Sequence, residues 1–218
     1  ASSMLKSLVS AKTDKNISGI ILKINSPGGT VAMSQNIYNK ILEVRNIKPV
    51  VAVFEDIGAS GAYYIASAAD RIVAQEGSLV GSIGVIFSFM DFHNLLANKL
   101  NINSVVIKSG KFKDIGSGTR EMTDEEKTLM QEIINDSYEQ FVIAIINGRI
   151  NRTDNYNVEK TNLTEQTLRM FADGRIFTGR QAKKLGFIDQ TGDMDTAKTM
   201  ITSMMQQKYK NDLPASLV

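Results

Sequence analysis

Apolar runs alternate with longer amphipathic stretches along this chain, and the alternation predicts an α/β protein. Residues 18–24 are an apolar run closed by turn residues and predict a buried strand. Residues 31–46 carry apolar side chains at helical spacing, and residues 49–54 predict a second strand. This order of strand, helix and strand indicates a sheet covered by helices.

Further elements are expected in the rest of the chain. The apolar pattern predicts strands at 71–75, 82–88 and 103–108 and helices at 91–100 and 196–208. Thr123 and Thr178 each precede a Glu or Gln by three residues, the capping-box pattern that begins a helix. We therefore expect a long helix over 124–148 and a short one that ends near Gly186. Because no internal repeat or low-complexity linker is visible, a single domain over 1–218 is expected.

Composition and charge exclude several classes of function. Apolar residues make up 43% of the chain, charged residues 22%, and the net charge of +2 does not indicate a nucleic-acid partner. The absence of cysteine excludes disulfides, thiol nucleophiles and cysteine-bound metals, and the single histidine, His93, excludes a multi-histidine metal site. Neither a metal nor a cofactor is expected. No apolar run of 18 residues predicts a membrane-spanning helix in this sequence.

Ser60 is the first candidate for chemistry. It lies in Gly58-Ala59-Ser60-Gly61-Ala62, between the strand at 49–54 and a short apolar helix expected to reach about Ala69. A tight turn with small neighbours can present a nucleophilic hydroxyl, and the free N–H groups of the following helix can stabilise an oxyanion. An ordinary helix N-cap explains the same residue, because serine is favoured at that position.

A second glycine-rich turn, Ser26-Pro27-Gly28-Gly29, follows the first predicted strand. Glycine allows backbone N–H groups to approach a ligand closely, although Pro-Gly is also common in ordinary turns. Ligands of α/β sheets bind where strands end. Two such turns at the ends of neighbouring strands therefore favour an oxyanion hole built from both.

A nucleophilic serine requires a base, and the chain offers two candidates. His93 lies at the start of a predicted helix, where a partly exposed surface histidine is the more typical interpretation. Lys113 follows a predicted strand in a glycine-containing loop. A lysine acts as a base only where burial or nearby cations favour the neutral amine, and Lys108 and Lys111 are such cations. By charge pattern alone, a solvated basic loop explains the three lysines better.

An ordered set of motifs resembles the signal peptide peptidase A family of bacteria, the serine–lysine peptidases of inner membranes. The motifs are Asn25-Ser26-Pro27-Gly28-Gly29, Gly58-Ala59-Ser60-Gly61-Ala62-Tyr63-Tyr64-Ile65-Ala66, Gly81-Ser82-Ile83-Gly84-Val85-Ile86, Lys108-Ser109-Gly110-Lys111-Phe112-Lys113-Asp114-Ile115, Arg120-Glu121-Met122-Thr123, Asp173-Gly174-Arg175 and Gly179-Arg180-Gln181-Ala182. Together they cover about residues 18 to 192. Many members carry a second glycine where this chain has Ala62, a small change.

The resemblance implies a role for each matching residue. The family's nucleophile, the serine of the Ala-Ser-Gly-x-Tyr-Tyr stretch, corresponds to Ser60, and its base, the lysine before Asp-Ile, corresponds to Lys113. The serine of Gly-Ser-x-Gly-Val, which orients the lysine, corresponds to Ser82. The oxyanion-hole amides are expected from Gly28, Gly29 and Gly61.

The resemblance also implies a Clp protease/crotonase-like fold, a spiral of ββα units. The expected substrates are remnant signal peptides and other apolar or unfolded peptides. The expected assembly is a homo-oligomeric ring, in which the serine and the lysine can come from different subunits. The family implies an extracytoplasmic domain held at the bacterial cytoplasmic membrane by an N-terminal anchor; the anchor and the first strand are not visible in this sequence. A crotonase-like acyl-CoA enzyme and an inactive ring-forming scaffold remain as alternatives.

Overall fold

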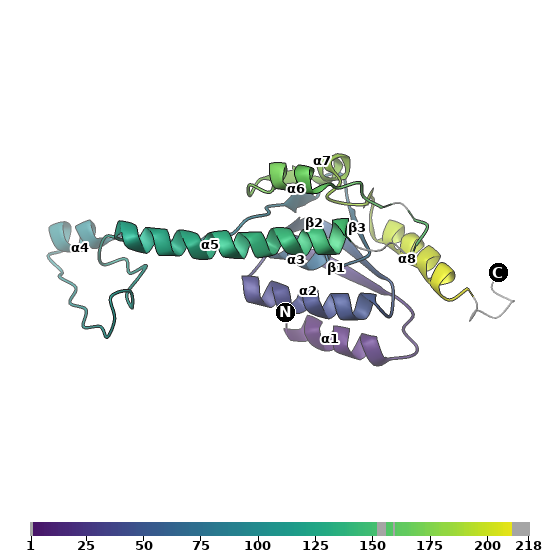
Figure 1. The fold of residues 1–218 in the computed structure, drawn as a ribbon, viewed down its shortest axis with the longest axis horizontal. Coiled ribbons are helices and arrows are strands. Elements are labelled where there is room, and N and C mark those ends of the chain that lie inside the picture. Colours follow the sequence, from purple (N-terminus) through teal and green to yellow (C-terminus); the bar gives the residue numbers. More distant parts are fainter. Residues whose placement is uncertain (1, 152–155, 159, 211–218) are drawn as a thin grey trace. The chain divides into compact units, whose positions relative to one another are not determined.

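The computed structural model describes residues 2–151, 156–158 and 160–210 (Figure 1). The chain divides into two compact units. Unit 1 comprises Ala1–Gly84 with Gln140–Val218, and unit 2 comprises Val85–Glu139. Each unit is described by itself below.

Unit 1 is a mixed sheet with helices on both faces. Its strands are β1 (Ile20–Ser26), β2 (Val50–Ala59), β3 (Arg71–Ala74), β4 (Leu79–Gly81), β5 (Ile176–Thr178) and β6 (Gln190–Thr191). Its helices are α1 (Ser2–Thr13), α2 (Val31–Arg45), α3 (Gly61–Ala66), α6 (Glu165–Phe171), α7 (Gly179–Leu185) and α8 (Met194–Lys208), together with the end of α5 (Asp124–Ile145) and a π-helical turn, η1 (Ile146–Ile150).

The long strand β2 organises the sheet. It runs parallel to β1 on one side, and on the other side its first half pairs with β3 and its second half with β4. Ser26 of β1 pairs with Gly58, and Gly81 of β4 pairs with Ala59. Because parallel strands end at the same edge of a sheet, the turns after these residues are neighbours.

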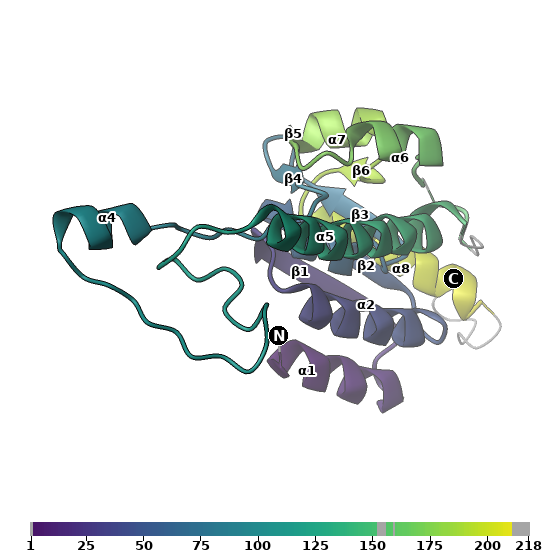
Figure 2. The same cartoon turned by 60° about the vertical axis from the view of Figure 1, so that its left-hand side comes forward.

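Helices lie on both faces of the sheet around β2 (Figures 1 and 2), and side chains of β2 pack against each helical layer. Val51 and Val53 pack against α8 through a cluster that includes Met200. On the opposite face, the Phe54 ring lies 6.4 Å from the Tyr63 ring of α3, measured between centroids. The sheet thus has a helix-covered apolar face on each side, as an α/β architecture requires.

A buried ion pair joins η1 to the sheet of unit 1. Arg149 donates from Nη2 to Asp189 Oδ2 at 2.5 Å, and neither side chain is exposed. Asp189 also accepts hydrogen bonds from the backbone N–H groups of Ile72, at 2.6 Å, and Thr161, at 2.7 Å. The carboxylate therefore connects three segments that are distant in sequence.

Unit 2 contains α4 (His93–Lys99) and the first part of α5. Residues 85–92 and 100–123, all of them described, form neither helix nor strand (Figure 2). No apolar side chain of this unit is buried, although every one of its residues is described. Unit 2 therefore lacks a hydrophobic core of its own.

Several predictions of local structure are confirmed. The helix expected at 31–46 is α2, the capping box at Thr178 begins α7, and Gly186 ends α7 in the left-handed conformation with φ 87°. The helix expected at 124–148 is α5 followed by η1. No helix in the described ranges combines the length and apolar character that a bilayer-spanning segment needs.

Two predicted strands are wrong, and two helices were not predicted. At 82–88 the chain leaves the sheet, because β4 is formed earlier, by Leu79–Gly81. At 103–108 the described backbone has no strand partner, and the Ile107 side chain is 98% exposed, so the apolar run is not a buried strand. The additional helices are α1 and α6.

Candidate active site

Ser60 occupies a strained turn between β2 and α3. Its backbone adopts φ 51° and ψ −124°, a conformation that residues other than glycine rarely adopt and that costs about 1–3 kcal/mol. Its carbonyl accepts the first helical hydrogen bond, from the N–H of Tyr64 at 2.9 Å. Its side chain makes no capping bond to the described helix α3. The geometry therefore does not support the N-cap interpretation, and the half-buried hydroxyl is available for chemistry.

The Gly28–Gly29 turn lies directly against Ser60. A Cβ added to Gly28, whose φ is +127°, would lie 2.8 Å from Ser60 Cβ and 3.0 Å from the Gly61 nitrogen. A Cβ added to Gly61 would lie 3.0 Å from the Gly29 nitrogen and 2.5 Å from Ser34 Oγ. Distances below 3.0 Å essentially never occur for a real Cβ, and 3.0 Å is shorter than most such contacts. The two glycine-rich turns thus pack backbone to backbone, and amides of both turns lie beside Ser60.

Ser82 lies immediately after β4, at the same edge of the sheet. Its backbone has φ 50°, and its N–H donates to the Arg175 carbonyl at 2.8 Å. The preceding residue, Gly81, accepts the Ser60 N–H at 2.8 Å. Unit 1 therefore brings five of the six predicted site residues to one edge of the sheet: Gly28, Gly29, Ser60, Gly61 and Ser82.

A cavity of about 440 Å³ opens beside the glycine turns. Gly28, Gly29 and Gly61 line one side of it. Its apolar lining is contributed by Met4, Ile24, Met33, Ile37, Ala62 and Ile65. Met4 belongs to α1, a helix that the apolar pattern did not predict. An apolar peptide side chain fits the chemistry of this lining.

The helix that follows Ser60 is fixed by buried tyrosines. The Tyr63 hydroxyl donates to the Phe187 carbonyl at 2.7 Å, and burial raises the pKa of this hydroxyl well above its ordinary value. The Tyr64 ring lies 4.8 Å from the Phe141 ring, measured between centroids. These contacts fix the direction of α3, and so the position of its first N–H groups.

Lys113, the sixth predicted site residue, belongs to unit 2. It is exposed, in a series of turns in which its N–H donates to the Gly110 carbonyl at 3.1 Å. Lys108 forms an ion pair with Asp114, and Lys111 with Glu125. Lys113 itself makes no ion pair within the described part of the chain. Of the three loop lysines, it is the one left without a carboxylate partner there.

His93, the other candidate base, also belongs to unit 2. The ring Nδ1 of His93 lies 2.6 Å from Asp91 Oδ1, and the backbone N–H of His93 donates to the same oxygen at 2.9 Å. These bonds lower the pKa of Asp91. The pair joins residues two positions apart just before and at the start of α4, which is typical of a local Asx turn.

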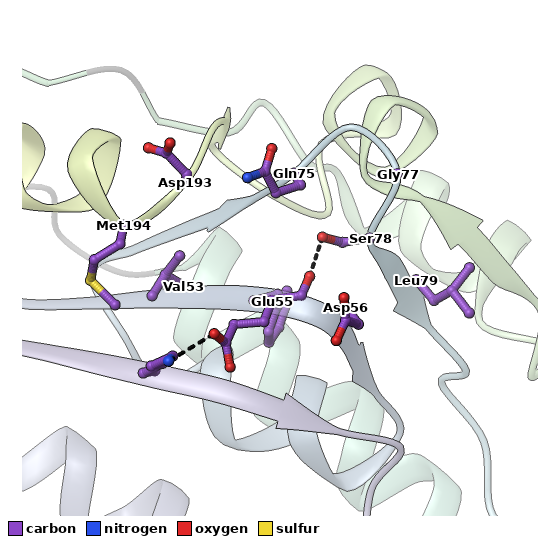
Figure 3. Close-up of a pocket in the computed structure, with 11 residues that line it drawn as sticks. Val53, Glu55, Asp56, Gln75, Gly77, Ser78, Leu79, Asp193 and Met194 are labelled. Atoms are coloured by element: carbon purple, nitrogen blue, oxygen red, sulfur yellow. Dashed lines mark hydrogen bonds and ion pairs between the residues drawn. The ribbon is translucent and has the colours of Figure 1, made fainter.

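A larger cavity, of about 820 Å³, lies on the α8 face of the sheet (Figure 3). Its carboxylates are already engaged: Glu55 pairs with Lys23 at 2.8 Å, Asp56 accepts from Asn25, and Asp193 caps α8. None of the predicted catalytic or oxyanion-hole residues lines it. We therefore assign the candidate active site to the Ser60 edge.

Comparison with known proteins first defines the fold. The profile named Clp protease matches residues 1–76. A solved structure, the S97A mutant of the 1510-N membrane-bound stomatin-specific protease, superposes with a TM-score of 0.51 at 16% identity, covering 89% of this chain and 74% of that one. The expected Clp protease/crotonase-like fold is thus confirmed.

Sequence relatives then define the family. The profile of Peptidase family S49 matches residues 43–209. A candidate protease of Methanocaldococcus jannaschii is 41% identical over 84% of this chain, and a candidate signal peptide peptidase SppA of Enterococcus faecium is 33% identical over 95%. The chain spans 55% and 59% of the lengths of these relatives. The chain belongs to peptidase family S49.

Proposed function

We propose that this protein is a serine endopeptidase with Ser60 as nucleophile and Lys113 as general base. The observation that carries the proposal is the Ser60 turn: a strained backbone, a hydroxyl not used for capping, and a glycine turn packed against it. Functional sites concentrate such strain, because the surrounding structure must stabilise it. The substrates we propose are remnant signal peptides and other apolar or unfolded peptides.

In the proposed reaction, the neutral amine of Lys113 takes the proton of Ser60 Oγ while the oxygen attacks the peptide carbonyl. The backbone amides of Gly29 and Gly61 donate to the tetrahedral oxyanion. Lys113 then gives its proton to the leaving amine, and the C–N bond breaks. Water hydrolyses the acyl-enzyme by the reverse steps, and Ser82 orients the lysine. No cofactor takes part.

The position of Gly61 supports its proposed role. It is the first residue of α3, and the first N–H groups of a helix have no partner within the helix. The Gly29 nitrogen lies close to the Gly61 backbone, so two donors can converge on one oxygen. The apolar cavity beside them supports a preference for apolar side chains near the cleaved bond.

The two members of the proposed dyad lie in different units, so the working site requires the Lys113 loop to meet Ser60, within one chain or between copies. We propose a homo-oligomeric ring. Its support is the apolar surface of unit 2, where Ile86, Met90, Val105 and Ile107 are each at least 70% exposed. We also propose that the protein acts at the bacterial cytoplasmic membrane, on its extracytoplasmic side; the support is a relative named a signal peptide peptidase.

The test is intact-mass spectrometry after incubation with a fluorophosphonate, on the wild type, Ser60→Ala, Lys113→Ala and His93→Ala. One adduct on the wild type and on His93→Ala, with none on the other two variants, is the expected result, since nucleophile and base act as a unit. Labelling of Lys113→Ala at the wild-type rate would refute the lysine base. No labelling of the assembled wild type would favour an acyl-CoA enzyme or a scaffold instead.

A further inference from the structure

Hydrogen bonds among a series of charged side chains hold the loop that contains Lys113. Asp114, the next residue, accepts from Arg120 through both carboxylate oxygens, at 2.9 Å from Nε and 2.8 Å from Nη2. Lys108 donates to the same carboxylate at 2.5 Å. A bidentate arginine–carboxylate pair fixes orientation as well as distance. The Asp114 carboxylate is therefore held toward Arg120.

Arg120 connects this carboxylate to the start of α5. Its Nη1 donates to Glu126 Oε2 at 2.8 Å, and Glu126 is 2% exposed. Glu126 also accepts the Thr123 N–H at 2.9 Å, which completes the capping box of α5. These bonds lower the pKa of Asp114, and they lower that of Glu126 to about 2. Both groups are therefore carboxylates at neutral pH.

The other charged groups of this region are also mutually paired. The charged residues of the loop and of the first turn of α5 are Lys108, Lys111, Lys113, Asp114, Arg120, Glu121, Asp124, Glu125 and Glu126. Glu125 pairs with Lys111, and Asp124 with Lys127 at 2.9 Å. Apart from the exposed Glu121, each of these carboxylates has a cation other than Lys113.

We propose that Arg120 is a positioning residue that acts through Asp114, holding its carboxylate away from the Lys113 amine and fixing the turn that presents this lysine. The inference rests on the proposed role of Lys113 as base. An opposite charge beside an amine favours the protonated form, which cannot accept a proton from serine. By retaining Asp114, Arg120 keeps the adjacent lysine free of such a partner.

The test follows the rate constant of fluorophosphonate labelling from about pH 6 to about pH 10. The assembled full chain is used as wild type, Arg120→Gln, Asp114→Asn and the double variant Arg120→Gln/Asp114→Asn. In Arg120→Gln the Asp114 carboxylate keeps only Lys108 and loses its bidentate orientation, so it should move the midpoint of the pH profile up by about one unit and lower the rate at neutral pH by about tenfold. The double variant, which lacks that carboxylate, should regain the wild-type midpoint.

An Arg120→Gln profile with the wild-type midpoint, whatever its absolute rate, would overturn the inference. So would a double variant that keeps the shifted midpoint, because the shift would then not come from Asp114. Should Arg120→Gln fail to fold, Arg120→Lys retains the charge without the bidentate geometry, and a smaller shift in the same direction is expected. Wild-type labelling of Lys113→Ala would instead refute the proposed function.

Discussion

The backbone N–H of Ser60 donates a 2.8 Å hydrogen bond to the carbonyl oxygen of Gly81, the residue before Ser82. The bond continues the parallel pairing of β2 with β4 by one residue beyond Ala59. It therefore fixes the Ser60 turn to the strand end from which Ser82 emerges. Both serines have positive φ, 51° for Ser60 and 50° for Ser82, so this hydrogen bond connects two strained turns.

Replacing Ser60 should separate catalysis from stability. Its side chain makes no cap bond within the described structure, so Ser60→Ala should leave the free energy of unfolding unchanged within about 0.5 kcal/mol. Ser60→Gly should raise it by about 1 kcal/mol, because glycine relieves the positive φ. Both variants should lose fluorophosphonate labelling. Urea denaturation measures the first effect and intact mass the second.

Thr178→Ala is the matched control for the Ser60 variants. Thr178 is a true N-cap whose side chain accepts from the Gln181 N–H, so its loss should cost about 1 kcal/mol. A similar loss in Ser60→Ala would show that its hydroxyl caps α3 after all.

Gly28→Ala should reduce the labelling rate strongly, beyond its effect on the stability of the fold. The added Cβ would lie 2.8 Å from Ser60 Cβ, so the two turns must separate and the oxyanion donors must move. We expect a loss of about 10²-fold or more in labelling rate, the usual effect of removing one such donor. Gly77→Ala is the control, since its Cβ would point into open space. Equal rates for the two variants would contradict the proposed oxyanion hole.

Asp189→Ala should destabilise the protein by about 3–5 kcal/mol, because it leaves the Arg149 charge buried without its partner. It also removes the acceptor of two backbone N–H groups, those of Ile72 and Thr161. Chemical denaturation gives the value. The exposed pair Lys198–Asp195 provides the comparison: Lys198→Ala should change stability by less than about 0.5 kcal/mol. A small destabilisation by Asp189→Ala would mean that the surrounding residues rearrange after the carboxylate is removed.

Acid should loosen the Arg120 cluster of unit 2. Hydrogen bonds from Arg120 and Thr123 lower the pKa of Glu126 from 4.5 to about 2 in the folded chain. Since the folded pKa is the lower one, this stabilisation is complete above pH 4.5 and is lost as the pH falls toward 2. Glu126→Gln should therefore flatten the acid side of the melting temperature plotted against pH. The exposed Glu132→Gln on the same helix should leave that curve unchanged.

Elements with local signals were predictable from the sequence. The capping box at Thr178 and the left-handed Gly186 define α7 within a few residues, because capping uses only nearby atoms. The glycine turns at Gly28 and Gly61 were also recognisable. That the two turns meet was expected from neighbouring strand ends, but their close backbone packing was not predictable, since it depends on the register of β1 against β2.

The wrong strand prediction at 103–108 has a physical cause. Periodicity assumes that the chain itself buries its apolar residues. Val105 and Ile107 are 85% and 98% exposed, so their β-branched run has no neighbouring strand to join. Met4 was missed for a different reason: α1 reaches the cavity because it packs on α2, and Lys48, which follows α2, donates to carbonyls at the end of α1. Neither the packing of α1 nor the contacts of Lys48 produces a recognisable pattern in the local sequence.

The lack of buried apolar side chains in unit 2 has a consequence for the activity of a newly made chain. Unit 1 has its own core and contains the Ser60 turn, whereas the Lys113 loop is held within unit 2 by charged hydrogen bonds and not by a core. On the proposed mechanism, a newly made, unassociated chain would carry a nucleophile without a working base. Such a chain would be a latent enzyme, harmless to the proteins around it until it meets its partners.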